Sequence, residues 1–506
     1  MVMPPLDSIN DTLLHNFTWT VGVVAHVFLF CAVALHLLLH PRDPRATIAW
    51  LFFTWAVPVL GAFSYLTLGV NRAREKSWQK LHSDQTFRSS RDHHERVTQP
   101  LAYWRGLRAA LLARPTDVAA QSLNAFLDRI MPDHPLLGGN TVRPLVDASE
   151  AFPDMFAAIQ NAKHHIHLQS YIIGADETGH KLMAALAERA AAGVQVRVLY
   201  DAFGSAHARL HGFFRHYADQ PNLWIVPFTQ ANFLKNQFQL NLRNHRKILV
   251  VDGAIGYTGG MNFYDVYLAR PGFEPTHDFH FRVEGPAVME LQYSFLRDWF
   301  YMTDEDPRKL LAPCFFPPPA IPGHTPVRLL NNGPTASEIE TLMDAWFEAI
   351  VCARRQILIV SPYFVPPDEI RRALRTAAMR GVDVKILVPA KSNHPHVDHA
   401  SHALYESLLD SGVRIFELPP PMLHGKALLV DDGISFVGSS NVDARSLRLN
   451  YETNLVVLDE TFTATMKQIV LADFARANEI EPAAWRARPI HRKIIENFCA
   501  LMSPVF

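Results

Sequence analysis

A short polar motif occurs twice in this sequence and sets the framework for the rest of the chain. The first copy, HRKILVVD, spans residues 245–252, and the second, HGKALLVD, spans residues 424–431, so both read H-x-K-x4-D. Each copy is followed at the same offset by small residues and an Asn, GGMN at 259–262 and GSSN at 438–441. One copy arises easily by chance in a chain with 25 His. Two copies with matched turns predict a duplicated unit that handles phosphate.

The sequence around each motif also repeats, which extends the duplication to two whole domains. Gly193 and Gly381 each end a helix rich in Ala, Leu and Arg and open an alternating strand. This strand–helix–strand order predicts an α/β fold of the α-β-α sandwich type, with a largely parallel sheet covered by helices on both faces. The repeated pieces in the first and second halves are 158–170 and 349–361, 180–192 and 368–380, and 223–228 and 413–418.

A Pro-rich stretch, residues 313–325, separates the two halves and is expected to form a stiff, extended linker. We therefore expect two similar domains, residues 136–312 and 326–506, related by a pseudo-two-fold and packed face to face around one site. An N-terminal segment, residues 1–70, precedes them. Residues 71–135 are expected to be a helical connector beside the membrane.

The N-terminal segment contains two apolar runs, residues 17–39 and 46–70, that carry no formal charge. Each is long enough to cross about 30 Å of hydrocarbon as a helix. The connector at 40–45 is short and turn-prone, so the sequence predicts a transmembrane hairpin. A cleaved signal peptide is disfavoured because residues 1–16 contain no Lys or Arg. Pro58 and Gly61 leave open a re-entrant or interfacial second segment.

The Lys and Arg residues that flank the two runs predict their orientation. Residues 1–16 have none, the connector has two, and residues 71–80 have Arg72, Arg74, Lys76 and Lys80. The most basic flank therefore leads into the main body of the chain. We expect a multi-pass protein of the cytoplasmic membrane, with the two domains and the N-terminus on the cytoplasmic side.

The overall composition argues against several classes of function. The chain has 48 basic and 49 acidic residues, whereas a general nucleic-acid binder normally has a basic surplus. Its four Cys are scattered and form no C-x-x-C pair, which is typical of reduced, structural cysteines. The cluster of His164, His165 and His167 is interpreted as part of a strand that enters the sheet, and no His or Cys spacing predicts a metal site.

The repeated residues suit phosphodiester chemistry. Residues i and i+2 of a strand share a face, so His245 projects with Lys247, and His424 with Lys426. One His can attack phosphorus while the other protonates the leaving alcohol, and both roles are accessible near neutral pH. The two Lys can stabilise the non-bridging oxygens, which removes the need for a metal. Asn262 and Asn441 are expected to share that task.

Asp252 and Asp431 complete the two motifs and are included among the catalytic candidates. Each follows a continuously apolar strand at its turn. They are expected to hold the site together through hydrogen bonds, or else to contact substrate.

At this point the sequence resembles the phospholipase D superfamily and, within it, bacterial cardiolipin synthases with an N-terminal membrane hairpin. The resemblance covers essentially the whole chain. It is carried by RNHRK at 243–247, GGMN at 259–262, HFRVEGP at 280–286, GSSNVDARS at 438–446, LNYE at 449–452 and LMSP at 501–504. The resemblance further implies two acids, Asp278 and Glu452, that accept hydrogen bonds from the catalytic imidazoles. We assign Asp278 to the His245 half, the expected nucleophile half, and Glu452 to the His424 half, the expected acid/base half.

The resemblance implies phosphatidyl transfer without a cofactor. One phosphatidylglycerol would form a phosphatidyl-histidine, and a second would displace it to give cardiolipin and glycerol. The partners would be phospholipids and the membrane, with no nucleic acid. The alternatives are a phospholipase D hydrolase, a synthase that uses phosphatidylethanolamine as the phosphatidyl donor, a nuclease and a non-catalytic lipid-binding protein.

Overall fold

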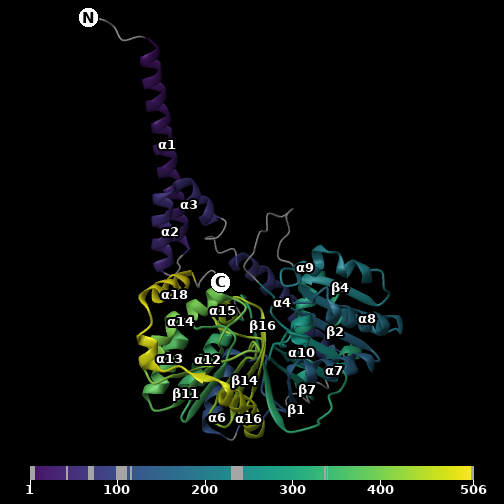
Figure 1. The fold of residues 1–506 in the computed structure, drawn as a ribbon. Coiled ribbons are helices and arrows are strands. Elements are labelled where there is room, and N and C mark those ends of the chain that lie inside the picture. The colour runs from purple at the N-terminus through teal and green to yellow at the C-terminus, as the bar shows by residue number, and fades with distance from the viewer. Residues whose placement is uncertain are drawn as a thin grey trace, which may run out of the picture. The chain divides into compact units, whose positions relative to one another are not determined.

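The computed structural model describes residues 6–40, 44–66, 73–97, 111–113, 115, 117–228, 243–334, 338 and 340–502. The chain divides into two compact units, Met1–Glu75 (unit 1) and Lys76–Phe506 (unit 2). Unit 1 carries the apolar helices, and unit 2 carries both copies of the motif (Figure 1). Each unit is described by itself.

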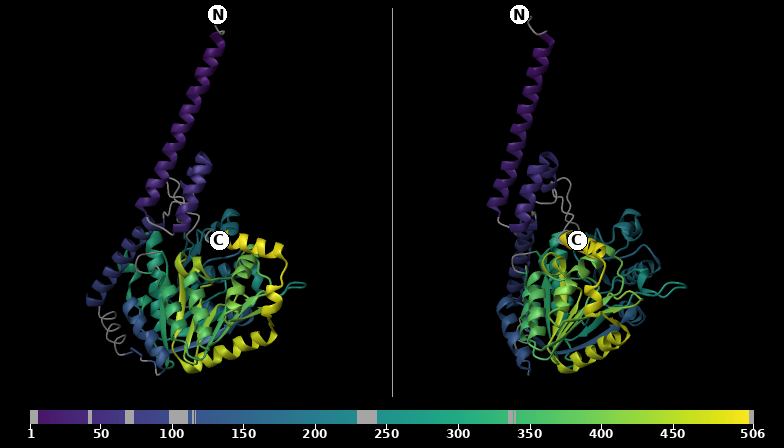
Figure 2. Two further views of the ribbon diagram at one scale, coloured as in Figure 1. Left: turned by 90° about the vertical axis from the view of Figure 1, so that its left-hand side faces the viewer. Right: turned by 60° about the vertical axis from the view of Figure 1, so that its left-hand side comes forward.

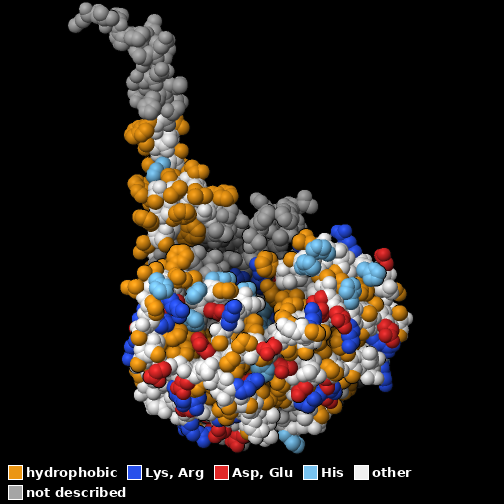
Figure 3. Space-filling view, viewed as in Figure 1, with side chains coloured by type: hydrophobic (Ala, Val, Ile, Leu, Met, Phe, Trp, Pro, Cys, Tyr) orange, Lys and Arg blue, Asp and Glu red, His pale blue; other side chains and the backbone are white. Residues whose placement is uncertain are grey.

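Unit 1 consists of α1 (Leu6–Leu39), α2 (Pro44–Ala56) and α3 (Pro58–Ser64). Within α1, Trp19–Leu39 is long and apolar enough to cross a membrane, judged by length and composition. Its described side chains are mostly hydrophobic at the surface, as Figure 3 shows. The first predicted span is therefore a continuous helix.

The second predicted span is not continuous, which departs from the expected hairpin of two full crossings. The helix breaks at Val57 because Pro58 has no N–H to donate and disfavours a helical residue before it. The chain then turns back: the rings of Trp50 and Tyr65 lie 5.5 Å apart, centroid to centroid. Gly61 permits this close packing, since a Cβ there would lie 2.7 Å from the carbonyl oxygen of Phe53. The described part of the second run is thus two short helices that fold back on each other, and residues 67–70 lie outside the described residues.

Unit 2 is built on one continuous sheet of 15 strands. Its order is β4-β3-β2-β5-β6-β7-β1 in the first half, followed by β8-β16-β14-β13-β9-β11-β12-β17 in the second. The two halves repeat the same order outward from the centre. They join edge to edge where β1 pairs antiparallel with β8, with Leu137 opposite Val327 and Asn140 opposite Thr325. The halves therefore share a sheet, whereas the sequence analysis expected two sandwiches packed face to face.

The strands of this sheet are β1 (Leu137–Val146), β2 (His165–Ser170), β3 (Gln195–Asp201), β4 (Leu223–Phe228), β5 (Ile248–Val251), β6 (Ile255–Gly259), β7 (Phe279–Glu284), β8 (Thr325–Asn332), β9 (Gln356–Val360), β11 (Asp383–Pro389), β12 (Arg414–Leu418), β13 (Ala427–Val430), β14 (Ile434–Gly438), β16 (Glu452–Val457) and β17 (Asn478–Glu479). A separate parallel pair is formed by β10 (Phe364–Val365) and β15 (Val442–Asp443).

The sheet is mixed, and the prediction of a largely parallel sheet was wrong. Only β2, β3 and β4, and their counterparts β9, β11 and β12, run parallel to one another. Each motif strand instead forms a hairpin with the next strand, β5 with β6 and β13 with β14. Tight turns join antiparallel strands, and Asp252 and Asp431 supply the positive φ angles, 52° and 49°, that these turns need. The helical crossovers seen in the sequence cover only part of each half.

Helices cover both faces of the sheet, as predicted for a sandwich (Figures 1 and 2). One core lies under α10 and α16 and extends across both halves. On the other face, each half has one further core under its own helices. The α-helices that the structure describes in unit 2 are α6 (Val118–Ile130), α7 (Asp147–Gln160), α8 (Glu177–Ala191), α9 (Ala206–Leu210), α10 (Ala287–Thr303), α11 (Pro307–Leu310), α12 (Thr341–Cys352), α13 (Asp368–Met379), α14 (Pro395–Leu409), α15 (Ala444–Arg448), α16 (Glu460–Arg476), α17 (Pro482–Arg486) and α18 (Ile490–Met502). Most of α4 (Ala73–Val97) also belongs to unit 2.

Candidate active site

The two motif histidines lie just before β5 and β13, and the backbone of each is hydrogen-bonded to the other half of unit 2. The His245 N–H donates to the carbonyl of Tyr451 (2.9 Å). In the same way, the His424 N–H donates to the carbonyl of His277 (2.6 Å). These backbone bonds form short parallel bridges outside the main sheet. Each histidine is therefore positioned by the half to which it does not belong.

The two predicted acids lie beside the histidines, but the pairing is crossed. His245 Nδ1 lies 3.0 Å from Glu452 Oε2, and His424 Nδ1 lies 2.6 Å from Asp278 Oδ2. The expected pairing of Asp278 with His245 and of Glu452 with His424 was therefore wrong. The bridges explain the exchange, because Glu452 follows Tyr451 and Asp278 follows His277 directly in the chain.

This pairing fixes how each imidazole is presented. A carboxylate beside Nδ1 holds the proton on that nitrogen and leaves Nε2 as the free atom. Burial lowers the pKa of His245, and Glu452 opposes this effect. Burial and the ammonium of Lys426 lower the pKa of His424 to about 4. Both imidazoles are thereby favoured in the neutral form, in which Nε2 is available as a nucleophile or base.

The carboxylates stay ionised although they are fully buried. Burial by itself raises the pKa of Asp278, but Lys426 and His424 bring it below its ordinary value. The pKa of Glu452 is likewise lowered, against burial, by His245 and Lys247. An ionised acid behind each imidazole stabilises the positive charge that develops when the ring is protonated or phosphorylated.

The two motif lysines are buried beside their histidines. Lys247 Nζ donates to the carbonyl of His245 (2.8 Å), and Lys426 Nζ lies 2.8 Å from His424 Nδ1. Burial lowers the pKa of Lys247 to about 7 and that of Lys426 to about 8. The ammonium of each half also lowers the pKa of the opposite histidine, so the two motifs act on one another electrostatically. Such buried cations attract an anionic phosphodiester.

The glycine-rich turns make room for the acids. A Cβ at Gly260 would lie 2.1 Å from Asp278 Oδ1, so the carboxylate occupies the space that a side chain would fill. Ser439 takes the equivalent place in the second half, and its hydroxyl donates to Glu452. The turns then place Asn262, whose Oδ1 accepts from the Ile172 N–H (3.1 Å). The buried Asn441 Oδ1 accepts no hydrogen bond from any residue that the structure describes.

The motif aspartates lie at the far ends of β5 and β13 from the histidines. Asp252 accepts hydrogen bonds from three consecutive backbone N–H groups, those of Lys163, His164 and His165 (2.7–2.9 Å). Asp431 accepts from residues 354–356 in the same manner (2.7–3.0 Å). Of the two roles considered for these acids, the geometry fits the holding of the strands, and the motif imidazoles pair with Glu452 and Asp278 instead.

Several residues that contact the site could not be identified by comparing the two repeated halves of the sequence. Arg246, fully buried between His245 and Lys247, bonds to Asp298 (2.7 Å) and to the carbonyl of Glu452 (3.2 Å). Its counterpart in the second motif is a glycine, so comparing the halves gave no reason to select it. The hydroxyl of Tyr267 lies 3.3 Å from Asp278 Oδ2, and the ring of Tyr171 packs edge-on against His245 (5.0 Å between centroids). Only the tertiary structure identifies these contacts.

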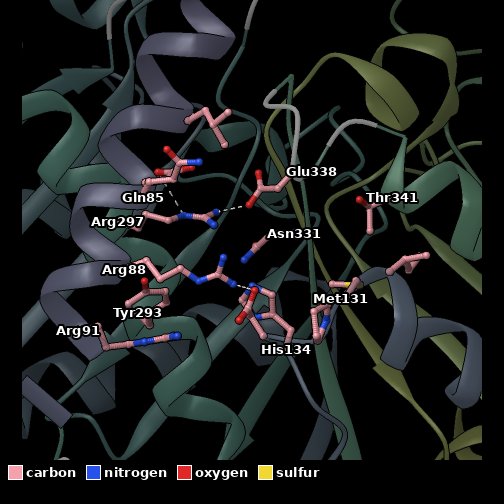
Figure 4. A pocket seen from close by; sticks show the side chains of 15 residues that line it. Gln85, Arg88, Arg91, Met131, His134, Tyr293, Arg297, Asn331, Glu338 and Thr341 are labelled. Carbon is pink, nitrogen blue, oxygen red and sulfur yellow. Dashed lines mark ion pairs between the residues drawn. The ribbon is translucent and has the colours of Figure 1, made fainter. Parts of the chain in front are cut away.

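A cavity of about 390 Å³ lies apart from the motif residues (Figure 4). Arg297 projects into it and pairs with Glu338 (2.5 Å), while Arg88 pairs with Asp133. Its acids and bases thus neutralise one another. Through Glu338, which also pairs with Arg246, it adjoins the buried ionic network that supports the first motif.

The histidine cluster lies where the sequence analysis placed it. His165 and His167 belong to β2 and are buried in the core. His167 bonds to Gln292 (3.1 Å) and stacks on Phe295 (4.8 Å between centroids). These contacts account for His165 and His167 as part of the packed interior, whereas His164 is exposed and lies just before the strand.

Comparison with known proteins agrees with this geometry. The family model described as "Cardiolipin synthase, PLD-like domain" matches residues 155–299 and 347–474, and "Phospholipase_D-nuclease N-terminal" matches residues 28–69. The chain is 35% identical to a cardiolipin synthase of Geobacillus thermodenitrificans, over 98% of this chain and 96% of the relative. It is 36% identical to cardiolipin synthase A of Pseudomonas fluorescens, over 94% of this chain and 96% of the relative.

Among solved structures, phosphatidylserine synthase of Haemophilus influenzae matches with a TM-score of 0.56 at 15% identity, covering 76% of this chain and 98% of that one. At that identity the match supports the fold. Two matched family regions, full-length relatives and two crossed His–acid pairs lead to one conclusion. The chain belongs to the cardiolipin synthase family of phospholipase D-like enzymes.

Proposed function

We propose that this chain transfers a phosphatidyl group from one phosphatidylglycerol to another and releases cardiolipin and glycerol. The crossed arrangement of His245 with Glu452 and His424 with Asp278 is the observation that carries the proposal. It supplies two oriented imidazoles to one site, which a double displacement at phosphorus requires.

In the first step, His245 Nε2 attacks phosphorus and forms a P–N bond. The bond from phosphorus to the glycerol oxygen breaks, and His424 gives a proton to that oxygen. The anionic phosphodiester bound beside the His424 imidazole favours the protonated form that this step needs. In the second step, His424 accepts the proton of the terminal hydroxyl of a second phosphatidylglycerol. That oxygen attacks phosphorus, the P–N bond breaks, and cardiolipin is released with both histidines restored.

The lysines and asparagines have the supporting roles that the sequence analysis gave them. Lys247 and Lys426 neutralise the non-bridging oxygens, whose negative charge grows in each transition state. Asn262 and Asn441 lie at the ends of equivalent turns and are suited to donate hydrogen bonds to the same oxygens. Removing one aimed donor of this kind typically costs about 3–4 kcal/mol of transition-state stabilisation.

Unit 1 attaches the enzyme to the bacterial inner membrane, with unit 2 at the cytoplasmic face. We infer one complete crossing by α1, because α2 is short and α3 turns back beside it. This replaces the earlier expectation of two crossings and puts the N-terminus on the outer side. Cysteines introduced at residue 8 and at residue 379 should then react with an impermeant thiol reagent from opposite faces of sealed vesicles. Reaction from one face would restore the two-crossing hairpin.

The reaction is tested with the purified full chain and phosphatidylglycerol vesicles in the presence of a chelator. Cardiolipin and glycerol should appear in equal amounts, and His245→Ala should abolish both products and the covalent lipid adduct. Phosphatidic acid as the main product would identify a hydrolase instead. Adding phosphatidylethanolamine and measuring ethanolamine release tests the other donor.

A further inference from the structure

The last described helix of unit 2, α18, faces the wrong way for a helix of a soluble domain. Its exposed side carries Ile490, Ile494, Ile495, Phe498 and Leu501, each between 47% and 78% exposed. The side that packs on α14 instead contains Glu496, which is only 4% exposed. A helix at a water-exposed surface normally turns its apolar stripe inward. This largely apolar side, which also carries the exposed His491, is therefore expected to bind another surface.

Polar contacts hold α18 in this orientation. Glu496 accepts a hydrogen bond from Arg488 (2.8 Å), and the Arg488 guanidinium lies 3.5 Å from the centre of the Trp485 ring. Lys493 donates to the carbonyl of Arg486 (2.9 Å). These contacts all lie within unit 2, and rotation of the helix to bury its apolar side would break them. The polar contacts on the opposite side of α18 therefore keep its apolar side at the surface.

The surface charge on α18 indicates what covers it. Arg492 is exposed and forms no ion pair within the part of the chain that the structure describes. Figure 3 shows hydrophobic side chains together with Lys, Arg and His where α18 lies in Figure 1. Large apolar residues on one side with a basic residue beside them are typical of a helix that lies in the interface of an anionic membrane.

The helix is also connected to the candidate active site. It packs along α14, and α14 begins directly after His394. The ring of His394 lies 5.4 Å from that of Tyr363, which lies 6.3 Å from the His424 ring, both between centroids. Figures 1 and 2 place α18 and α16 at opposite ends of unit 2, with α15 at the α18 end. A surface bound by α18 would therefore lie at the end of the sheet that holds the site.

We propose that α18 is an interfacial helix that docks unit 2 on a bilayer rich in anionic phospholipid. Its five apolar side chains insert below the headgroups, and Arg492 contacts lipid phosphate. The proposal rests on the proposed function to this extent: a lipid substrate has to leave the bilayer at the site. Docking shortens that path and adds a contact that unit 1 does not supply.

A fluorescence measurement tests the docking without reference to catalysis. The full chain, with its four cysteines replaced by Ser, carries a single environment-sensitive label through Phe498→Cys and is reconstituted in phosphatidylglycerol vesicles. A quencher attached to the lipid acyl chains should reduce emission at position 498 by at least about twofold. The matched control is Met379→Cys, an exposed apolar position on α13 that should not be quenched. Equal quenching at positions 498 and 379 would overturn the proposal. Energy transfer between labelled copies without quenching by lipid would overturn it too, because the apolar side would then bind a second copy.

Activity supplies a second readout. Ile494→Glu with Phe498→Glu should lower the rate on phosphatidylglycerol vesicles by roughly tenfold, because charge on the apolar stripe opposes insertion. The rate on dispersed short-chain phosphatidylglycerol should stay near wild type, which excludes misfolding, and Met379→Glu should leave both rates unchanged. An unchanged vesicle rate would refute the docking role. Quenching without cardiolipin formation would reject the proposed function and leave the docking intact.

Discussion

The crossed His–acid pairs make a prediction that separates the two halves of the site. Glu452→Gln keeps the size of the side chain and a hydrogen-bond acceptor but removes the charge behind His245. Glu452 lies in the second half of the chain. If each histidine paired with the acid of its own half, Glu452→Gln would impair His424. The structure predicts the defect at His245, the proposed nucleophile.

The size of the effect follows from the geometry. His245 becomes positively charged when phosphorus bonds to Nε2, and Glu452 Oε2 lies 3.0 Å from its Nδ1 in a fully buried position. Two unit charges at that distance attract by about 5.5 kcal/mol at an effective dielectric constant of about 20. Each 1.36 kcal/mol is a factor of about ten in rate, so forming the adduct should slow by roughly 10⁴.

The assay uses a phosphatidyl ester of p-nitrophenol, whose phenolate departs without a proton from the enzyme. Forming the adduct then needs the nucleophile and no general acid. Wild type and Asp278→Asn should both give a burst of p-nitrophenolate, since Asp278 supports His424. Glu452→Gln should lose the burst. A burst that survives in Glu452→Gln and disappears in Asp278→Asn would refute the crossed pairing, or the choice of His245 as nucleophile.

Three further predictions concern charged side chains of the two motifs and of the buried network behind them. Since Lys247 and Lys426 have pKa values lowered to about 7 and about 8, their charges are lost as pH rises, and kcat/KM for the p-nitrophenyl ester, which needs no proton from His424, should fall above about pH 7. Lys247→Arg keeps its charge and should move this alkaline limit to about 8 in a pH–rate profile; an unmoved limit would contradict the assignment. Asp298→Asn should cost about 3–5 kcal/mol of unfolding free energy in urea denaturation, because it leaves buried cations without their anion. The pKa of Asp298 is held well below its ordinary value, so wild type should lose this advantage as pH falls below about 4, and a difference that persists in acid would count against the pairing. Asp252→Asn should lower the melting temperature, with about 1.5–3 kcal/mol lost, yet leave kcat of the folded enzyme near wild type; a large loss of kcat with unchanged melting would restore a catalytic role.

The sequence alone determined the features that depend on local spacing. The i, i+2 placement of His245 and Lys247 at the start of an apolar strand follows from strand geometry, and the second copy confirms it by repetition. The continuous apolar helix within α1, long enough to cross a membrane, follows from the length of an uncharged apolar run. The family follows from the same motifs, since they recur at fixed distances along nearly the whole chain.

Tertiary structure decided which groups act on which. Glu452 lies 207 positions from His245 along the chain, and no local rule indicates that the backbone at Tyr451 would bridge to the first motif. Arg246 differs from Gly425, its counterpart in the second motif, so the repeat does not select it. Its importance follows only from its buried ion pair with Asp298. The reversal of α3 on α2 is likewise a packing outcome, in which Pro58 breaks the helix and Gly61 lets the two helices meet. Contacts between distant segments depend on how the two halves join. The periodicity of residues within one segment gives no information about how they join.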